Sequence, residues 1–275
     1  MSEYETFTFD VDDGVAVLTL DHPPVNLLDA AMIGDAARLV GELPERDDVR
    51  VVIVRSADPD FFIAHADLRL IQQLPRDITE RGSELGLFHQ VVEQWRTLPQ
   101  VTIAQLEGRA RGGGSEFALS LDLRFAATGR AVLSQPEVSV GIIPGGSGTQ
   151  RLPRLMGRGR ALEIVLGCDD FDAETAERYG WVNRALPPDE LAPFVERLAH
   201  RIAGFPPDAV RRAKASVDAA TGTITEGLIE EAYQFNRTLA DPDIDARMEG
   251  ALALGAQTRE GELELGTLIE RADRE

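Results

Sequence analysis

Two glutamates, each beside a glycine-rich stretch, are the residues of this sequence best suited to chemistry. Glu116 follows the glycine triplet 112–114, and Glu137 precedes the glycine-rich stretch 141–148. Such turns expose backbone N–H groups, which can bind an anion or a developing oxyanion. Two carboxyl groups in a dry pocket take different pKa values, so one can donate a proton while the other accepts one. This combination suits the addition or removal of water, or proton transfer beside a carbonyl group.

A third stretch, Phe61 to Leu68, could supply further backbone donors, and Asp67 in it is a suitable N-cap for a helix. Each stretch also has a purely structural explanation. The triplet could serve a tight helix–strand crossing with Glu116 stabilised by the helix dipole, and the other two stretches could be packed loops. The stretch after Glu137 lacks the Gly-Lys-Ser/Thr ending of a P-loop and the GxGxxG spacing of a dinucleotide-binding turn.

The elements that must position these residues alternate between strands and helices, which indicates an α/β fold. Apolar periodicity predicts a hairpin at 6–11 and 14–20, strands at 51–55, 101–106, 123–127 and 131–134, and helices at 29–42, 66–74, 84–98 and after Gly113. Four helical periods follow, at 188–203, 206–220, 223–240 and 243–257. We therefore expect a core domain at 1–200 and a helical region at 201–275, with a charged tail, 260–275, that frays.

Composition restricts the class of protein further. The chain has 275 residues with a formal net charge of −19, which disfavours nucleic acid and anionic membranes as partners. The single cysteine, Cys168, cannot form an internal disulfide. The N-terminus is acidic and polar, unlike a signal peptide, and no apolar run reaches the length of a membrane span. We expect a cytoplasmic protein with no metal site.

At these residues the sequence resembles the enoyl-CoA hydratase/isomerase (crotonase) superfamily, from residue 15 to about residue 237. The matching motifs are GGGxE at 112–116, QPE at 135–137, GIIPGxxGTQRL at 141–152, AExA at 173–176, GWV at 180–182 and AVxxAK at 209–214. The resemblance implies a crotonase-like spiral of ββα units, with a C-terminal helical region that builds a homotrimer or a dimer of trimers.

The resemblance also assigns roles to individual residues. The backbone N–H groups of Ala66 and Gly113 would form an oxyanion hole for the thioester oxygen. Glu116 would activate a water for attack at the β-carbon, and Glu137 would deliver the proton to the α-carbon. Because the sequence has both glutamates, it favours an enoyl-CoA hydratase.

The CoA thioester is itself the substrate, so the resemblance implies no cofactor. The pantetheine arm is expected to pass the loop with Val25 and Leu27 and the stretch after Ala64. Arg69 is a candidate for the CoA phosphates, although an exposed helix arginine would look the same. The residues expected to contact substrate are Val25, Leu27, Ala64, His65, Asp67, Leu68, Arg69 and Gly112.

Two places depart from the family pattern. His65 stands where the family usually has glycine, and it could line the acyl pocket, act as an acid or base, or pack beneath the loop. Residues 249–267 are small and acidic without an aromatic side chain, so CoA would be covered differently or bound with modest affinity. A double-bond isomerase, a decarboxylase, a C–C hydrolase or a non-catalytic acyl-CoA binder remain alternatives.

Overall fold

The computed structural model describes residues 4–78 and 80–272, and its strands form two sheets. The larger sheet has the order β1-β2-β3-β5-β7-β10, and the smaller has the order β4-β6-β8-β9. The bounds of the larger sheet are β1 Phe7–Asp12, β2 Val15–Leu20, β3 Val51–Ser56, β5 Val101–Leu106, β7 Leu123–Ala127 and β10 Arg184–Leu186. Those of the smaller are β4 Phe61–Ile63, β6 Arg109–Arg111, β8 Val132–Ser134 and β9 Phe171–Asp172.

The chain passes repeatedly from the larger sheet to the smaller sheet and then into a helix. β3 and β4 lead to α2 (Leu68–Gln72) and α3 (Leu87–Thr97), and β5 and β6 lead to α4 (Gly113–Leu119). β7 and β8 lead through a short 3-10 turn to α5 (Gly148–Met156). The strands contributed by successive units pair in parallel within each sheet. This is the expected spiral of ββα units, and its unequal spacing explains why the sequence shows no fixed repeat.

The predicted hairpin is confirmed, whereas much of the smaller sheet escaped prediction. β1 and β2 pair antiparallel around Asp13 and Gly14, which both have positive φ, as a two-residue hairpin loop requires. β4 lies in the stretch 61–68, for which the sequence predicts a loop, and the sequence predicts no strand at β6. Each has only three residues, and all of β4 is buried, so neither shows an alternating pattern.

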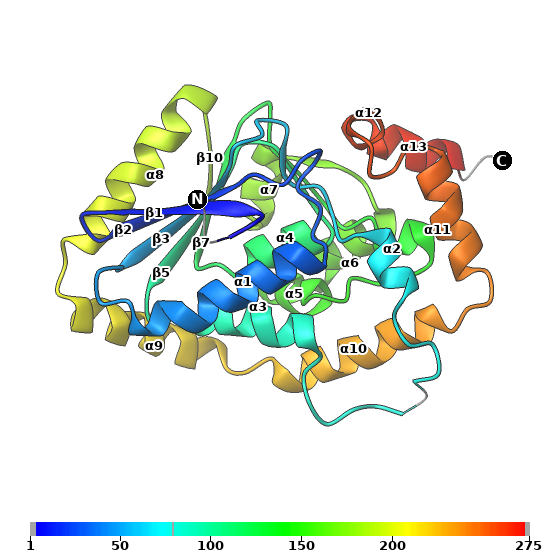
Figure 1. Ribbon diagram of the computed structural model, residues 1–275, viewed down its shortest axis with the longest axis horizontal. Helices are drawn as coiled ribbons and strands as arrows, with labels where there is room; N and C mark the ends of the chain where they lie inside the picture. The colour runs from blue at the N-terminus through cyan, green and yellow to red at the C-terminus, as the bar shows by residue number, and fades with distance from the viewer. Residues whose placement is uncertain (1–3, 79, 273–275) are drawn as a thin grey trace.

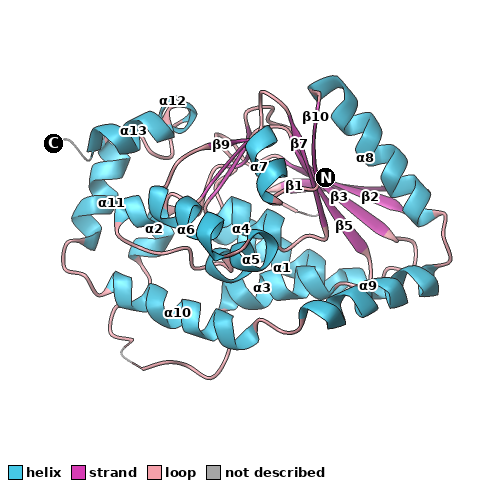
Figure 2. Cartoon of the chain, turned by 180° about the vertical axis from the view of Figure 1, so that it is seen from behind, coloured by secondary structure: helices cyan, strands magenta, loops and turns pink. Residues whose placement is uncertain are grey.

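Both faces of the larger sheet are covered, as Figures 1 and 2 show. Val51 and Ile53 pack against α8 (Pro188–Ala203), whereas Val52 and Val54 belong to the main core on the other face. Successive strand residues point to opposite faces, so this near-continuous apolar run suits a strand buried on both sides.

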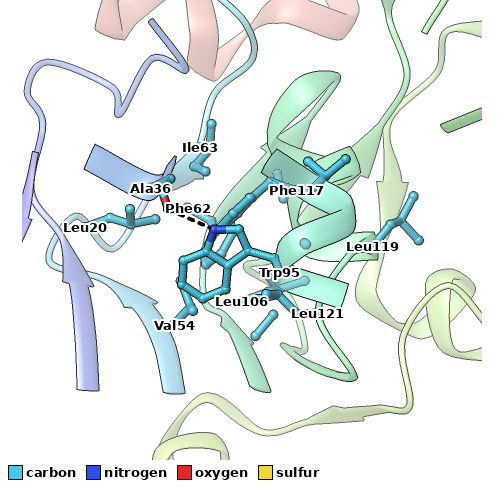
Figure 3. Packing of buried hydrophobic residues seen from close by; sticks show 14 of the residues in the cluster. Leu20, Ala36, Val54, Phe62, Ile63, Trp95, Leu106, Phe117, Leu119 and Leu121 are labelled. Carbon is cyan, nitrogen blue, oxygen red and sulfur yellow. Dashed lines mark hydrogen bonds between the residues drawn. The ribbon is translucent and has the colours of Figure 1, made fainter. Parts of the chain in front are cut away.

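Trp95 connects the helices of the main core to the helix that carries Glu116 (Figure 3). Its indole Nε1 donates to the carbonyl oxygen of Ala36 at 3.2 Å, within α1 (Ala30–Glu42). Its ring meets Phe117 of α4 edge-on, with centroids 5.4 Å apart. The aromatic pair therefore fixes α4 against the core and holds the neighbouring Glu116 in place.

The remaining helices are α6 Arg158–Gly167, α7 Ala173–Tyr179, α9 Pro207–Thr221, α10 Thr225–Leu239, α11 Ile244–Ala253, α12 Arg259–Leu263 and α13 Leu265–Ala272. The last three lie at the end of the molecule away from α8 (Figures 1 and 2). The expectation that 260–275 frays is wrong for 260–272, because α12 and α13 are helical and Glu262 is fully buried. Residues 273–275 lie outside the described residues. Within the described ranges, no helix combines the length and apolar character needed to cross a bilayer.

Candidate active site

Each glycine of the triplet 112–114 is required for a different structural reason. Gly112 has φ +47°, and a Cβ there would lie 2.7 Å from Glu137 Oε1. A Cβ on Gly113 would lie 2.9 Å from Leu28 Cδ2 and 3.3 Å from the Cβ of Ala66. A Cβ on Gly114 would overlap the carbonyl oxygen of Ile63. The tight crossing therefore accounts for Gly114, while Gly112 and Gly113 keep the backbone open beside Glu137 and Ala66.

The backbone N–H groups of Ala66 and Gly113 are neighbours. A Cβ on Gly113 would lie 3.6 Å from the Ala66 nitrogen, and Ala66 forms an isolated parallel bridge with Leu28. Among the hydrogen bonds of residues 4–78 and 80–272, none is donated by either N–H group. Gly113 begins α4, where a backbone N–H has no acceptor within the helix. Two adjacent donors are thus available to one acceptor.

Glu116 is buried in α4 and held by the opening of α5. Its Oε1 accepts from the Gly146 nitrogen at 2.8 Å and from the Gly148 nitrogen at 2.7 Å. Burial raises the pKa of Glu116 well above its usual range, and the negative charges of Glu137 and Glu231 raise it further. The two N–H donors oppose this rise, because they stabilise the carboxylate.

Glu137 begins the 3-10 turn Glu137–Val140 and is half-buried. Its Oε2 is buried and has no hydrogen-bond partner in the described part of the chain. Burial raises the pKa of Glu137 to about 8. Because the pKa values of both Glu116 and Glu137 are raised, the pair retains a proton near neutral pH and can act as one acid and one base.

A third carboxylate, which the sequence analysis missed, lies on the far side of the same turn. Glu231 of α10 accepts from the nitrogens of Ser147 at 2.6 Å and Thr149 at 2.9 Å. Its Oε1 also lies 2.9 Å from His89 Nε2. Successive N–H groups of the turn therefore bind Glu116 and Glu231 alternately. Glu231 is three residues after buried Leu228, and that helical spacing was the available signal.

His65 is buried, and both of its ring nitrogens have partners. Nδ1 lies 2.7 Å from the carbonyl oxygen of Ala66, and Nε2 lies 2.8 Å from Glu262 Oε1. Burial acts to lower the pKa of His65, but the Glu262 carboxylate and the two hydrogen bonds outweigh it, so the pKa is raised. Of the roles considered for His65, this geometry matches packing beneath the loop while also lining a cavity.

A cavity of about 590 Å³ lies beside Ala66 and Glu137. His65, Ala66 and Glu137 line one side, and residues of α11, of α13 and of the segment that follows α11, with Leu254 and Ala256, line another. The C-terminal helices therefore shape this cavity within one chain. Most of the surrounding side chains are apolar, which suits an acyl chain better than a charged group.

Of the predicted substrate-contacting residues, His65 and Leu68 line the cavity, whereas Val25, Leu27 and Ala64 form a separate small cluster. Val25 and Ala64 are buried side by side, since the Ala64 nitrogen donates to the Val25 oxygen at 3.2 Å, and Leu27 packs against the same small cluster. Asp67 caps α2 through its bond from the Arg69 nitrogen, as predicted, and Leu68 lines the cavity. The Arg69 residue is exposed and does not line that cavity.

Residues 4–78 and 80–272 contain no group of three His, Cys, Asp or Glu side chains arranged to hold a metal ion. The polar side chains that line the cavity in the described part of the chain are His65, Glu137, Ser139 and Arg247.

Comparison with known proteins defines the class. The family model described as enoyl-CoA hydratase/isomerase matches residues 10–253. The chain is 35% identical to the enoyl-CoA hydratase/isomerase family protein YngF of Bacillus subtilis, over 90% of this chain and 94% of that one. It is 33% identical to the crotonyl-CoA hydratase of Syntrophomonas wolfei, over 87% of this chain and 92% of that one.

A solved structure agrees with these relatives. A Streptomyces avermitilis protein assigned to the enoyl-CoA hydratases is 42% identical and superposes with a TM-score of 0.92, covering 99% of this chain and 100% of that one. The chain belongs to the enoyl-CoA hydratase/isomerase family and has the crotonase fold. It is an enzyme of the family that acts on CoA thioesters.

Proposed function

We propose that this protein is an enoyl-CoA hydratase, which adds water across the 2,3 double bond of a 2-enoyl-CoA thioester. The arrangement of Glu116 and Glu137 carries the proposal. Two N–H donors hold Glu116, whereas Glu137 has a buried oxygen with no partner among the described residues. A relative that is 33% identical and named a crotonyl-CoA hydratase supports the same reaction.

The thioester oxygen would accept hydrogen bonds from the backbone N–H groups of Ala66 and Gly113. Addition of hydroxide to the β-carbon pushes negative charge onto this oxygen, so donors placed there stabilise the transition state more than the ground state. The unused N–H groups and their closeness support this role. Removing one such donor typically lowers kcat by about 10²–10³-fold.

The two glutamates would divide the proton transfers. The Glu116 carboxylate accepts a proton from water as the water oxygen bonds to the β-carbon, and the protonated Glu137 then gives its proton to the α-carbon. Water is consumed, the double bond becomes a single bond, and one proton moves onto Glu116 while another leaves Glu137. Both pKa values are raised, so the pair holds a proton near neutral pH. In the reacting form that proton would lie on Glu137, and Glu116 would be the carboxylate that its two N–H donors stabilise.

The wider proposal covers substrate, assembly and location. The loop with Val25, Leu27 and Ala64 would guide the pantetheine arm, and the CoA thioester would serve as substrate without a cofactor. Residues 201–275 would build a homotrimer or a dimer of trimers. The net charge of −19 supports a protein that binds neither nucleic acid nor anionic membranes, and the single cysteine supports a cytoplasmic location.

The test is turnover of crotonyl-CoA and longer 2-enoyl-CoA thioesters, followed by loss of the conjugated enoyl absorbance and by product analysis. We expect 3-hydroxyacyl-CoA from the wild type, with Glu116→Gln and Glu137→Gln slowed about 10²–10⁴-fold each. A product with a shifted double bond and no added water would identify an isomerase instead. Binding of thioesters without turnover at any chain length would identify an acyl-CoA binder.

A further inference from the structure

The C-terminal segment 255–263 reaches the loop that carries Ala66. Besides the bond from Glu262 to His65, Gln257 Nε2 donates to Asp67 Oδ1 at 2.8 Å. The guanidinium of Arg259 pairs with Asp58 and Asp60. Residues of the segment 255–263 therefore bind both ends of the stretch 58–67. This stretch contains Ala66, one of the two proposed oxyanion donors.

Arg111 holds the backbone of Glu262 in place. It is buried directly before the glycine triplet, and its Nη1 donates to the Glu262 carbonyl oxygen at 2.8 Å. Its Nε and Nη2 donate hydrogen bonds to the Asp170 carboxylate at 2.7 and 2.6 Å. This bidentate pair holds the guanidinium in one orientation. The Gln257 nitrogen donates to Glu262 Oε1 at 2.7 Å. Contacts with Arg111 and Gln257 thus hold Glu262 in position independently of its bond to His65.

The partners of His65 require both ring nitrogens to carry protons when Glu262 is ionised. A carbonyl oxygen only accepts, so Nδ1 donates to Ala66, and an ionised carboxylate only accepts, so Nε2 donates to Glu262. A ring with both nitrogens engaged cannot exchange a proton with substrate unless one of these bonds breaks. The geometry therefore assigns His65 a task other than acid–base catalysis.

That task follows from the backbone around Ala66. The His65 carbonyl oxygen accepts from the Leu28 nitrogen at 2.9 Å, and the Asp67 nitrogen donates to the Leu28 oxygen at 3.1 Å. These bonds hold the peptide groups before and after Ala66 from one side. The His65 ring holds the Ala66 carbonyl oxygen as well. Because a peptide group is planar, the Ala66 N–H points away from the His65 carbonyl oxygen that Leu28 holds, and the His65 ring restrains the next peptide group and with it the rotation about the Ala66 backbone.

We propose that His65 and Glu262 are positioning residues: Glu262, carried by the C-terminal segment, orients the His65 imidazole, which in turn aims the Ala66 N–H at the thioester oxygen. This rests on the oxyanion role of Ala66 in the proposed function. Through Glu262, the C-terminal segment then supports the proposed oxyanion hole, although it touches none of the reacting atoms. Activity would depend on its docking against residues 58–67.

The experiment compares His65→Gln, Glu262→Gln and the double variant with the wild type. We expect kcat for a 2-enoyl-CoA to fall about 10–100-fold with KM within about threefold, because a misaimed donor loses most in the transition state. The double variant should be no slower than the slower single variant, since both act through one contact. Additive losses would overturn the proposal.

Matched controls come from the same chain. Glu260→Gln makes the same chemical change two residues away at an exposed position, and His200→Gln does so for an exposed histidine. Both should keep kcat within about twofold of the wild type, as surface changes usually do. Thermal unfolding identifies variants that fail to fold, and His65→Asn then offers a second, smaller amide side chain at the same place. A loss of stability with unchanged kcat in the folded fraction would contradict the positioning role.

A spectroscopic measurement separates this proposal from the proposed reaction. A saturated acyl-CoA labelled with ¹³C at the thioester carbonyl cannot be hydrated, and its carbonyl stretching frequency falls when the oxygen accepts strong hydrogen bonds. We expect a smaller fall in the His65→Gln and Glu262→Gln complexes than in the wild type. If the wild type lowers this frequency but hydrates no enoyl-CoA, the proposed reaction fails while the positioning role stands. Equal frequencies in the wild type and both variants would overturn the positioning role.

Discussion

Glu116 and Glu262 are two buried glutamates whose pKa values move in opposite directions. Burial acts to raise both, and for Glu116 the neighbouring charges of Glu137 and Glu231 add to that rise. Around Glu262, burial is outweighed by His65, its hydrogen bonds and Arg111, so the pKa is lowered. The contrast shows that the partner of a buried carboxyl group decides whether it exchanges protons or remains charged.

The difference separates two kinds of region in this molecule. Glu116 has backbone N–H groups as hydrogen-bond partners and, within the part of the chain that the structure describes, no cation beside it, so its carboxyl group can change its protonation state during a reaction. Around Glu262, cations on two sides hold the carboxylate charged and make it a fixed support. In the proposed function, the first region performs the proton transfers and the second holds the donors in place.

The strongest test of this division is proton exchange at the α-carbon of a saturated acyl-CoA in deuterated water. The reaction needs an acid–base group at the α-carbon and the oxyanion hole, but no attacking water. We expect Glu137→Gln to slow deuterium incorporation by about 10²–10⁴-fold, and Glu116→Gln to slow it by less than about tenfold. Mass spectrometry of the recovered thioester provides the rate.

Glu262→Gln should lie between these two variants in the same assay, because it weakens the proposed hole and leaves Glu137 intact. Glu264→Gln, an exposed neighbour, is the control and should match the wild type. If Glu116→Gln abolished exchange as fully as Glu137→Gln, the assignment of separate roles to the two glutamates would be wrong.

Sequence reasoning located the first region and missed the second, for a physical reason. Glycine turns beside Glu116 and Glu137 have a local signature, because close approach excludes side chains. Glu262 has no such signature: it lies among similar acidic residues, and only its partner 197 positions earlier in the chain distinguishes it. His65 stood out as a departure from the family, but its partner could not be found without the fold.

The same limit explains the outcome for the fold. Most of the longer helices and strands were predicted, because their apolar periods extend over enough residues to be recognised, whereas α6 and α7 were not. β4 and β6 are specified by pairing with each other rather than by a period of their own. The segment 255–263 is specified by contacts with 58–67 and Arg111, so its polar residues resembled a solvated tail.

A smaller effect, the dependence of stability on pH, should have opposite signs in the two regions. The pKa of Glu137 is raised to about 8, so its protonated form favours folding, and that contribution is lost as pH rises from about 4.5 through 8. The lowered pKa of Glu262 contributes stability above about pH 4.5, which is lost as pH falls through the folded-state value.

Glu137→Gln should therefore gain stability relative to the wild type as pH rises from about 5 to about 9, and Glu262→Gln should gain relative stability below about pH 4.5. A tenfold difference in proton affinity between the folded and unfolded states corresponds to about 1.4 kcal/mol, so the change for Glu137→Gln should reach a few kcal/mol at most. Urea unfolding across this pH range measures both differences. If both variants changed with the same sign over the same range, the contrast between the two regions would not hold.

The smallest expected effect concerns Glu231, which shares the turn 146–149 with Glu116. Its negative charge raises the pKa of both Glu116 and Glu137, so Glu231→Gln should lower both. We expect the alkaline limb of the kcat profile to move to lower pH by about 1 or less, because protonated Glu137 is lost sooner. Glu230→Gln, a half-buried neighbour on the same helix, should leave the limb unmoved. A shift toward higher pH would mean that Glu231 acts through the geometry of the turn and not through its charge, and would place it with Glu262 as a support.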